Sequence, residues 1–159
     1  MKHVVGVAEM KISNDPDDLF ITHALGSCLG VSVYDPEAGV GGVLHVMLPT
    51  SSVSPDKAIK NPYMFVDTGT PLFFRELYSR GAKKAHLVVK VAGGASVGRN
   101  KSDFFAIGKR NYTMLRKLFW KNQIPIKSQD VGGNIARTLY LDNQTGKTWL
   151  QSRGREWDL

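Results

Sequence analysis

The chain has 159 residues, of which 42% are hydrophobic and 22% charged, and its formal net charge is +7. This length and composition favour one globular domain, residues 1–159, with a sizeable core. The single cysteine excludes an internal disulfide and a multi-cysteine metal site, and the four histidines include no i, i+4 pair. We therefore expect no metal and no other cofactor.

No segment has the features of a signal peptide or a membrane span. The apolar run near the start covers only residues 4–8 before Glu9 and Lys11 follow, and no stretch approaches the roughly 20 apolar residues that a span needs. We expect a cytoplasmic protein with no membrane insertion. The positive charge favours acidic partners, but no basic stripe is interleaved with aromatic residues, so nucleic acid is not expected.

The predicted elements begin with a strand over residues 3–12, followed by a polar turn and a short strand over 19–22. The loop that comes next contains Gly26 and Ser27. Because both residues lack bulk, backbone or substrate can approach closely just before Cys28.

Two further strands form a predicted hairpin. Residues 29–34 alternate between apolar and small or polar side chains, residues 35–39 are typical of a turn, and residues 40–48 are apolar and rich in valine. Two strands joined by such a turn pair in the antiparallel sense.

The register of this hairpin decides what faces Cys28. A turn centred on Pro36 or Glu37 places the thiol opposite His45 or its neighbour Val46. Directly opposite residues have Cβ atoms about 4.5–5.5 Å apart, so the first register brings an imidazole beside a thiol, as an activated cysteine nucleophile requires. In the second register, His45 points to the other face of the sheet.

The middle of the chain is predicted to contain a loop, a helix and a strand. Residues 50–56 are typical of a surface loop, which either borders the site or is a plain connector. Residues 61–80 are predicted to be helical. The helix either starts at Thr70 with Pro71 at its first position or continues through Pro71 with a kink, which we favour. Residues 85–91 are rich in the β-branched residue valine and are predicted to form a strand.

Gly93, Gly94 and Ser96 lie in a turn of small residues after that strand. The turn resembles an anion-binding loop in composition only, because the pattern G-x-x-x-x-G-K-[ST] is missing and no helix opens on G-x-G-x-x-G. We expect close backbone packing near the site here, in a region that receives the substrate or a partner.

The clearest helix runs from about residue 102 to 122. Its apolar positions recur every three or four residues, and its cations lie mostly on another face, which is either solvated or a docking surface for an acidic partner. A strand over 124–128, a turn over 130–134 and a final hairpin of 135–141 with 147–151 follow, and the polar tail is expected to fray. Clustered strands and two long helices predict an α+β fold, a layered sandwich of mixed β-sheets with helices packed outside.

Cys28, His45 and Thr22 form the candidate catalytic set. A free thiol is only a few per cent thiolate at neutral pH, so the imidazole of His45 must take its proton and later pass it to a leaving amine. Thr22 would orient the imidazole through its other ring nitrogen. Backbone N–H groups around Gly26, Ser27 and the cysteine itself would hold an oxyanion.

Other interpretations of these residues remain open from spacing alone. A lone cysteine beside apolar residues is usually a buried, inert side chain. His23 and His86 also compete for the role of the base, although His86 lies on another predicted strand and is more typical of a structural histidine.

The segments read together resemble the CheD family, the chemoreceptor glutamine deamidases of bacterial and archaeal chemotaxis. They occur in the family's order and span roughly residues 4–150. The matching segments are Thr22, residues 25–28, residues 45–49, Tyr63, Asp67-Thr68, residues 81–83, residues 92–96, residues 107–111, residues 130–134 and Arg137.

The resemblance implies a catalytic Cys–His–Thr set, which falls here on Cys28, His45 and Thr22. It also implies a layered fold similar to deamidating bacterial toxins, and a protein-glutamine glutaminase activity on methyl-accepting chemotaxis receptors. The CheC phosphatase is implied as a partner of some members. The chain departs from the family pattern at residues 97–100, which in the family lie near the partner surface, so the departure bears on CheC docking and not on the chemistry. Some members act more as receptor-binding adaptors, so a non-catalytic adaptor is the alternative function.

Overall fold

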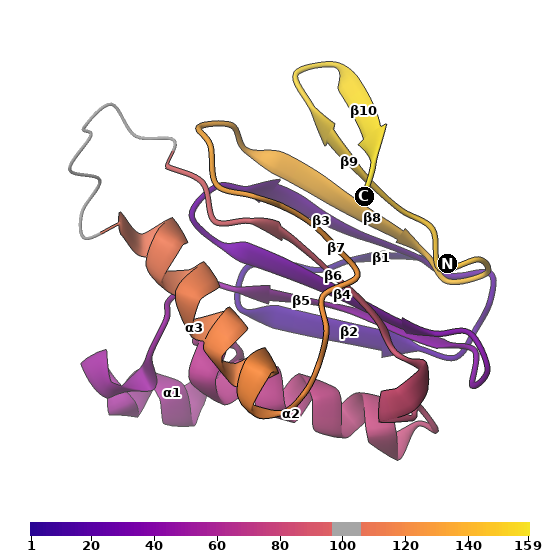
Figure 1. The fold of residues 1–159 in the computed structure, drawn as a ribbon, viewed down its shortest axis with the longest axis horizontal. Coiled ribbons are helices and arrows are strands. Elements are labelled where there is room, and N and C mark those ends of the chain that lie inside the picture. The colour runs from indigo at the N-terminus through magenta and orange to yellow at the C-terminus, as the bar shows by residue number, and fades with distance from the viewer. Residues whose placement is uncertain (97–105) are drawn as a thin grey trace.

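The computed structural model describes residues 1–96 and 106–159, which form two β-sheets and a layer of helices (Figure 1). The strands are β1 (Lys2–Val4), β2 (Glu9–Ser13), β3 (Leu19–Leu25), β4 (Leu29–Asp35), β5 (Val40–Val46), β6 (Val88–Gly93), β7 (Ser128–Val131), β8 (Arg137–Asp142), β9 (Thr148–Ser152) and β10 (Arg155–Asp158). The α-helices are α1 (Pro55–Lys60), α2 (Val66–Ser79) and α3 (Ile107–Lys121), and short 3₁₀ turns occupy Ser51–Val53, Pro62–Met64 and Lys84–His86.

Both sheets are mixed. Sheet A has the strand order β1-β3-β8-β9-β10, and sheet B has the order β2-β5-β4-β6-β7. The β1–β3 and β6–β7 pairs are parallel, whereas the other pairs are antiparallel. The predicted α+β class with mixed sheets and outer helices is therefore confirmed.

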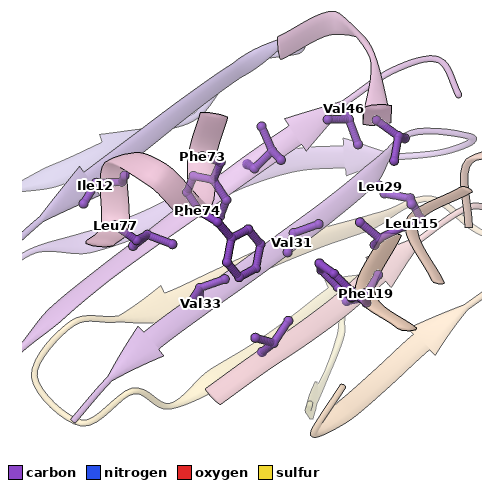
Figure 2. Close-up of a cluster of buried hydrophobic side chains, with 14 of the residues drawn as sticks. Ile12, Leu29, Val31, Val33, Val46, Phe73, Phe74, Leu77, Leu115 and Phe119 are labelled. Carbon is purple, nitrogen blue, oxygen red and sulfur yellow. The ribbon is translucent and has the colours of Figure 1, made fainter. Parts of the chain in front are cut away.

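Two hydrophobic clusters separate three layers. One lies between sheet B and the helices, where Phe73 and Leu77 of α2 and Leu115 of α3 pack on Val31 of β4 (Figure 2). The other lies between the two sheets and includes Phe20, Leu25, Val43, Leu139 and Leu150. Each fully buried side chain of this size contributes about 1.5–3 kcal/mol, so sheet B is held firmly on both faces.

The first predicted strand is wrong as a single element, because residues 3–12 divide between the sheets. β1 belongs to sheet A and β2 to sheet B. Between them the N–H of Gly6 donates to Glu9 Oε2 at 2.9 Å, and Ala8 adopts a φ of 59°. A left-handed alanine is uncommon, and the glycine of this connection, Gly6, is not the residue with the positive φ.

The middle of the chain is more helical than expected. The predicted loop at residues 50–56 is wrong in part, because it contains a 3₁₀ turn and the start of α1 at Pro55. The long helix starts at Val66 and continues through Pro71, so the alternative start at Thr70 is wrong. The predicted strand at 85–91 begins later, at Val88, after the third 3₁₀ turn.

Two predictions near the C-terminus are also wrong. The predicted strand over residues 124–128 contains Pro125, which has no N–H to donate, and the observed strand β7 begins only at Ser128 and includes the start of the predicted turn. The tail does not fray, because β10 pairs with β9 and Trp157 Nε1 donates to Asp130 Oδ2 at 2.8 Å. The start of the predicted helix at residues 102–105 and the departure at 97–100 lie outside the described residues.

Candidate active site

The β4–β5 hairpin forms as predicted, but in neither predicted register. His45 pairs with Gly30, and Leu29 pairs with Val46. Cys28 directly precedes β4 and lies two residues before Gly30, so strand alternation places its side chain on the same face as His45, one diagonal position away. Thiol and imidazole therefore share a face, although they are not directly opposite.

The turn chemistry explains the register. Asp35 Oδ1 accepts the N–H groups of Glu37 at 2.9 Å and Ala38 at 3.0 Å, and Asp35 pairs with Val40 to close the hairpin. The turn is thus centred between Glu37 and Ala38, later than the predicted centre at Pro36 or Glu37.

The shared face points into the space between the two sheets. Cys28 packs against the inter-sheet cluster and is partly exposed, whereas His45 is only 2% exposed. A Cβ on Gly30 would lie 2.8 Å from Leu25 Cδ1. The absence of a side chain at Gly30 lets sheet A approach sheet B closely beside the imidazole.

Thr22 on β3 contacts His45 from the opposite sheet. Thr22 Oγ1 lies 2.7 Å from His45 Nδ1 and 2.7 Å from the carbonyl oxygen of Val5. The hydroxyl has one proton, which it donates to the carbonyl, so it accepts the proton on Nδ1. This arrangement selects the tautomer in which Nε2 is unprotonated, and Nε2 is buried with no hydrogen-bond partner among the described residues.

Burial keeps both candidate reacting groups neutral at rest. It lowers the pKa of His45 from 6.5 to about 4, with a smaller opposing effect from Glu9. Burial also raises the pKa of the Cys28 thiol, against a smaller lowering by its own backbone N–H. The pair is therefore a thiol beside a free base, and the proton moves when the sulfur attacks.

The turn after β6 packs tightly on the cysteine loop, as expected. Gly94 N–H donates to the Cys28 carbonyl at 2.9 Å, and Ala95 N–H donates to the Gly26 carbonyl at 2.8 Å. A Cβ on Gly93, whose φ is 109°, would lie 2.2 Å from the Cys28 carbonyl oxygen. Ser96 is exposed at the end of this turn.

A cavity of about 390 Å³ adjoins the same turn. Gly94 and Ser96 border it on one side, Lys109 and Tyr112 of α3 on another, and Gly132 on a third. It adjoins the segment that packs on the cysteine loop, but neither Cys28 nor His45 lines it.

Asn111, which was not among the predicted site residues, lies on α3 and is fully buried. Its Nδ2 donates to the carbonyls of Ser27 at 2.9 Å and Met47 at 3.0 Å. The signal was present in the sequence: one polar residue interrupts the apolar stripe of an amphipathic helix, four residues before Leu115.

The competing histidines lie elsewhere. His23 is exposed on β3, and His86 Nε2 lies 2.6 Å from Glu37 Oε2 at the far end of the hairpin. Residues 1–96 and 106–159 contain no group of three or more side chains suited to hold a metal ion. Over the same ranges, no helix has the length and apolar character to cross a membrane.

Comparisons with known proteins agree with the resemblance in the sequence. The family model described as CheD chemotactic sensory transduction matches residues 47–152. The probable chemoreceptor glutamine deamidase CheD 1 of Syntrophus aciditrophicus is 48% identical, over 95% of this chain and 94% of its own. The probable chemoreceptor glutamine deamidase CheD of Solibacter usitatus is 44% identical, over 98% of this chain and 92% of its own.

A solved structure of a Neisseria meningitidis protein, matched by the family model DUF152, is 7% identical with a TM-score of 0.46, covering 83% of this chain and 63% of its own. That likeness is too distant to carry an argument. The curated relatives, by contrast, match nearly from end to end at identities far above what a common fold alone requires, and on that ground the chain belongs to the CheD family.

Proposed function

We propose that this chain is a chemoreceptor glutamine deamidase that acts as one domain, hydrolysing the side-chain amides of glutamines on methyl-accepting chemotaxis proteins to glutamate and ammonia. The names of the curated relatives support this activity and do not favour a non-catalytic adaptor. The observation that carries the chemistry is the buried Thr22–His45 hydrogen bond, which leaves Nε2 free on the face that Cys28 shares.

The proposed reaction is acyl transfer through a thioester. Cys28 Sγ attacks the carboxamide carbon while His45 Nε2 takes the thiol proton, so a C–S bond forms as the sulfur becomes nucleophilic. The imidazolium then gives that proton to the departing nitrogen as the C–N bond breaks, and ammonia leaves. Water attacks the thioester with His45 as base, which releases glutamate and restores the thiol.

Thr22 and the cysteine loop have supporting roles in this proposal. The Thr22 hydroxyl holds Nδ1–H, so Nε2 stays available as the base and the imidazolium is stabilised when it forms. Backbone N–H groups at Gly26, Ser27 and Cys28 would hold the developing oxyanion. The segment of Gly93, Gly94 and Ser96 would receive the substrate or a partner beside the cavity.

The remaining parts of the proposal rest on the family resemblance. The acidic surface of a receptor bundle would suit a chain of charge +7. The CheC phosphatase would be a protein partner, and the site of action would be the cytoplasm, where the receptor glutamines are exposed.

Mass spectrometry of a receptor cytoplasmic fragment tests the activity. We expect glutamines of the fragment to gain the mass of amide-to-acid conversion, with release of ammonia, and Cys28→Ala and His45→Gln to abolish both. His23→Gln is the matched control, because that imidazole is exposed on the same sheet as Thr22, and it should retain wild-type turnover. Undiminished ammonia release by Cys28→Ala would exclude the thioester route.

A further inference from the structure

The amide of Asn111 joins the loop that carries the candidate thiol to the segment directly after β5, the strand that carries the candidate base. Its Nδ2 donates to the carbonyl of Ser27, directly before Cys28, and to the carbonyl of Met47, two residues after His45. Both acceptors are carbonyl oxygens, so only the amide nitrogen can face them. The side chain is fully buried and its Oδ1 has no hydrogen-bond partner among the described residues, so the two bonds from Nδ2 are the ones that hold the amide in place.

Gly108 brings Asn111 into reach. A Cβ at Gly108 would lie 2.5 Å from the carbonyl carbon and oxygen of Gly94 and 2.7 Å from the Ala95 oxygen. The first turn of α3 therefore contacts the segment that is hydrogen-bonded to the cysteine loop. Asn111 follows three residues later on the same helical face.

The hydrogen bond from Asn111 to the Ser27 carbonyl also sets the direction of the Cys28 N–H. The Ser27 carbonyl and the Cys28 N–H belong to one planar trans peptide and point in opposite directions. Holding the carbonyl toward α3 therefore turns the N–H away from α3. The same N–H acts to lower the pKa of the Cys28 thiol, although burial outweighs it.

We infer that Asn111 is a positioning residue for the deamidation reaction, whose amide fixes the direction of the Cys28 N–H as an oxyanion donor and ties the cysteine loop to the end of β5. This inference rests on the proposed function. Asn111 acts through the backbone and does not touch the reacting atoms. It stabilises the tetrahedral intermediate by keeping a donor aimed where the negative charge develops.

Asn111→Ala tests the inference with two readouts. Removing one oxyanion donor costs roughly 10²–10³ in kcat, and misdirecting a donor costs less, so we expect kcat for ammonia release to fall roughly 10- to 100-fold with little change in KM. Alkylation of Cys28 by iodoacetamide forms no oxyanion, so its rate and its pH profile should stay at wild-type values.

If Asn111 had only a structural role, Asn111→Ala would change the alkylation rate and the stability as well as kcat. If Asn111 only stabilised the fold, its loss would expose the thiol, and alkylation would accelerate while kcat and the urea midpoint fell together. That result, or an unchanged kcat, would overturn the inference. Asn111→Ser retains one donor in a smaller side chain, so its kcat should fall less than that of Asn111→Ala. If the alanine variant does not fold, kcat and the alkylation rate are measured on the serine variant instead.

Two further variants separate this inference from the proposed function. Asn122→Ala removes an exposed amide at the end of the same helix, where Nδ2 donates to the Leu118 carbonyl at 2.8 Å, and should change neither readout. Cys28→Ala is assayed in parallel. If it still releases ammonia, the proposed function fails; if it does not and Asn111→Ala keeps full kcat, only the positioning role fails.

Discussion

The buried imidazole of His45 should make the stability of the folded chain depend on pH in a defined window. The folded state holds the pKa of His45 at about 4, compared with 6.5 for an unperturbed histidine. Below pH 6.5 the unfolded chain binds a proton at this imidazole that the folded chain does not accept until about pH 4. Acidification therefore favours the unfolded state, and stability that is fully present above pH 6.5 is lost as the pH falls toward 4.

The expected loss is about 3 kcal/mol, from the separation of the two pKa values at roughly 1.4 kcal/mol per unit. The side chain is 2% exposed, so solvent screening does not remove the effect. The carboxylate of Asp18 titrates at lower pH, because hydrogen bonds from Ser13, His3 and the N-terminal amine hold its pKa far below the usual range. Its contribution therefore falls outside the window of His45.

Urea unfolding of wild type and His45→Gln at pH values from 7 to 4.5 measures this difference. Glutamine has no proton to gain, so the variant should lack most of the pH dependence in that range, whatever its absolute stability. His23→Gln should keep the wild-type profile, because that side chain is exposed. Parallel loss of stability in wild type and His45→Gln would refute a buried neutral imidazole.

Two other pairs of variants test the orientation of the imidazole and the packing of the cysteine loop. Thr22→Val removes the hydroxyl that accepts the proton on His45 Nδ1, so kcat for ammonia release should fall roughly 10- to 100-fold. Thr22→Ser keeps a hydroxyl and should retain most of the wild-type kcat. Equal turnover of the two variants would contradict the orienting role. Gly93→Ala should cost about 2 kcal/mol or more in urea unfolding, because its Cβ would meet the Cys28 carbonyl at 2.2 Å. Gly154→Ala is the control, because Gly154 also has a positive φ but an added Cβ would meet nothing within 4 Å. An equal loss of stability in Gly154→Ala would show that backbone strain alone, without the clash, explains the result.

Local chemistry predicted the hairpin but not its register. Alternating side chains and turn residues suffice to pair residues 29–34 with residues 40–48. The register depends on the Asp35 carboxylate, which accepts two N–H groups in the turn. The sequence suggests such a turn but does not fix how many residues it encloses, so the prediction was off by one position or two.

The periodicity of apolar residues in the sequence does not predict the contacts between the two sheets. Thr22 was expected to orient His45 because it precedes the cysteine loop, yet the contact forms because β3 and β5 face each other from different sheets. The division of residues 3–12 between those sheets occurs at a non-glycine residue, Ala8, with a positive φ. Neither feature has a local sequence signal, so both required the three-dimensional structure.

The polar groups around Cys28 show why the site is assembled from such distant segments. Leaving a buried donor or acceptor unpaired costs about 1–3 kcal/mol, and the chain meets this demand at Nδ1 of His45 with Thr22 and at the Ser27 carbonyl with Asn111. Nε2 of His45 has no hydrogen-bond partner, and among the described residues the same holds for Thr70 Oγ1, Asn111 Oδ1 and Asn143 Oδ1. A purely structural histidine would gain by pairing both nitrogens. A base that must receive a proton has to keep one nitrogen unpaired until the substrate arrives, and the unpaired nitrogen lies on the face shared with the cysteine.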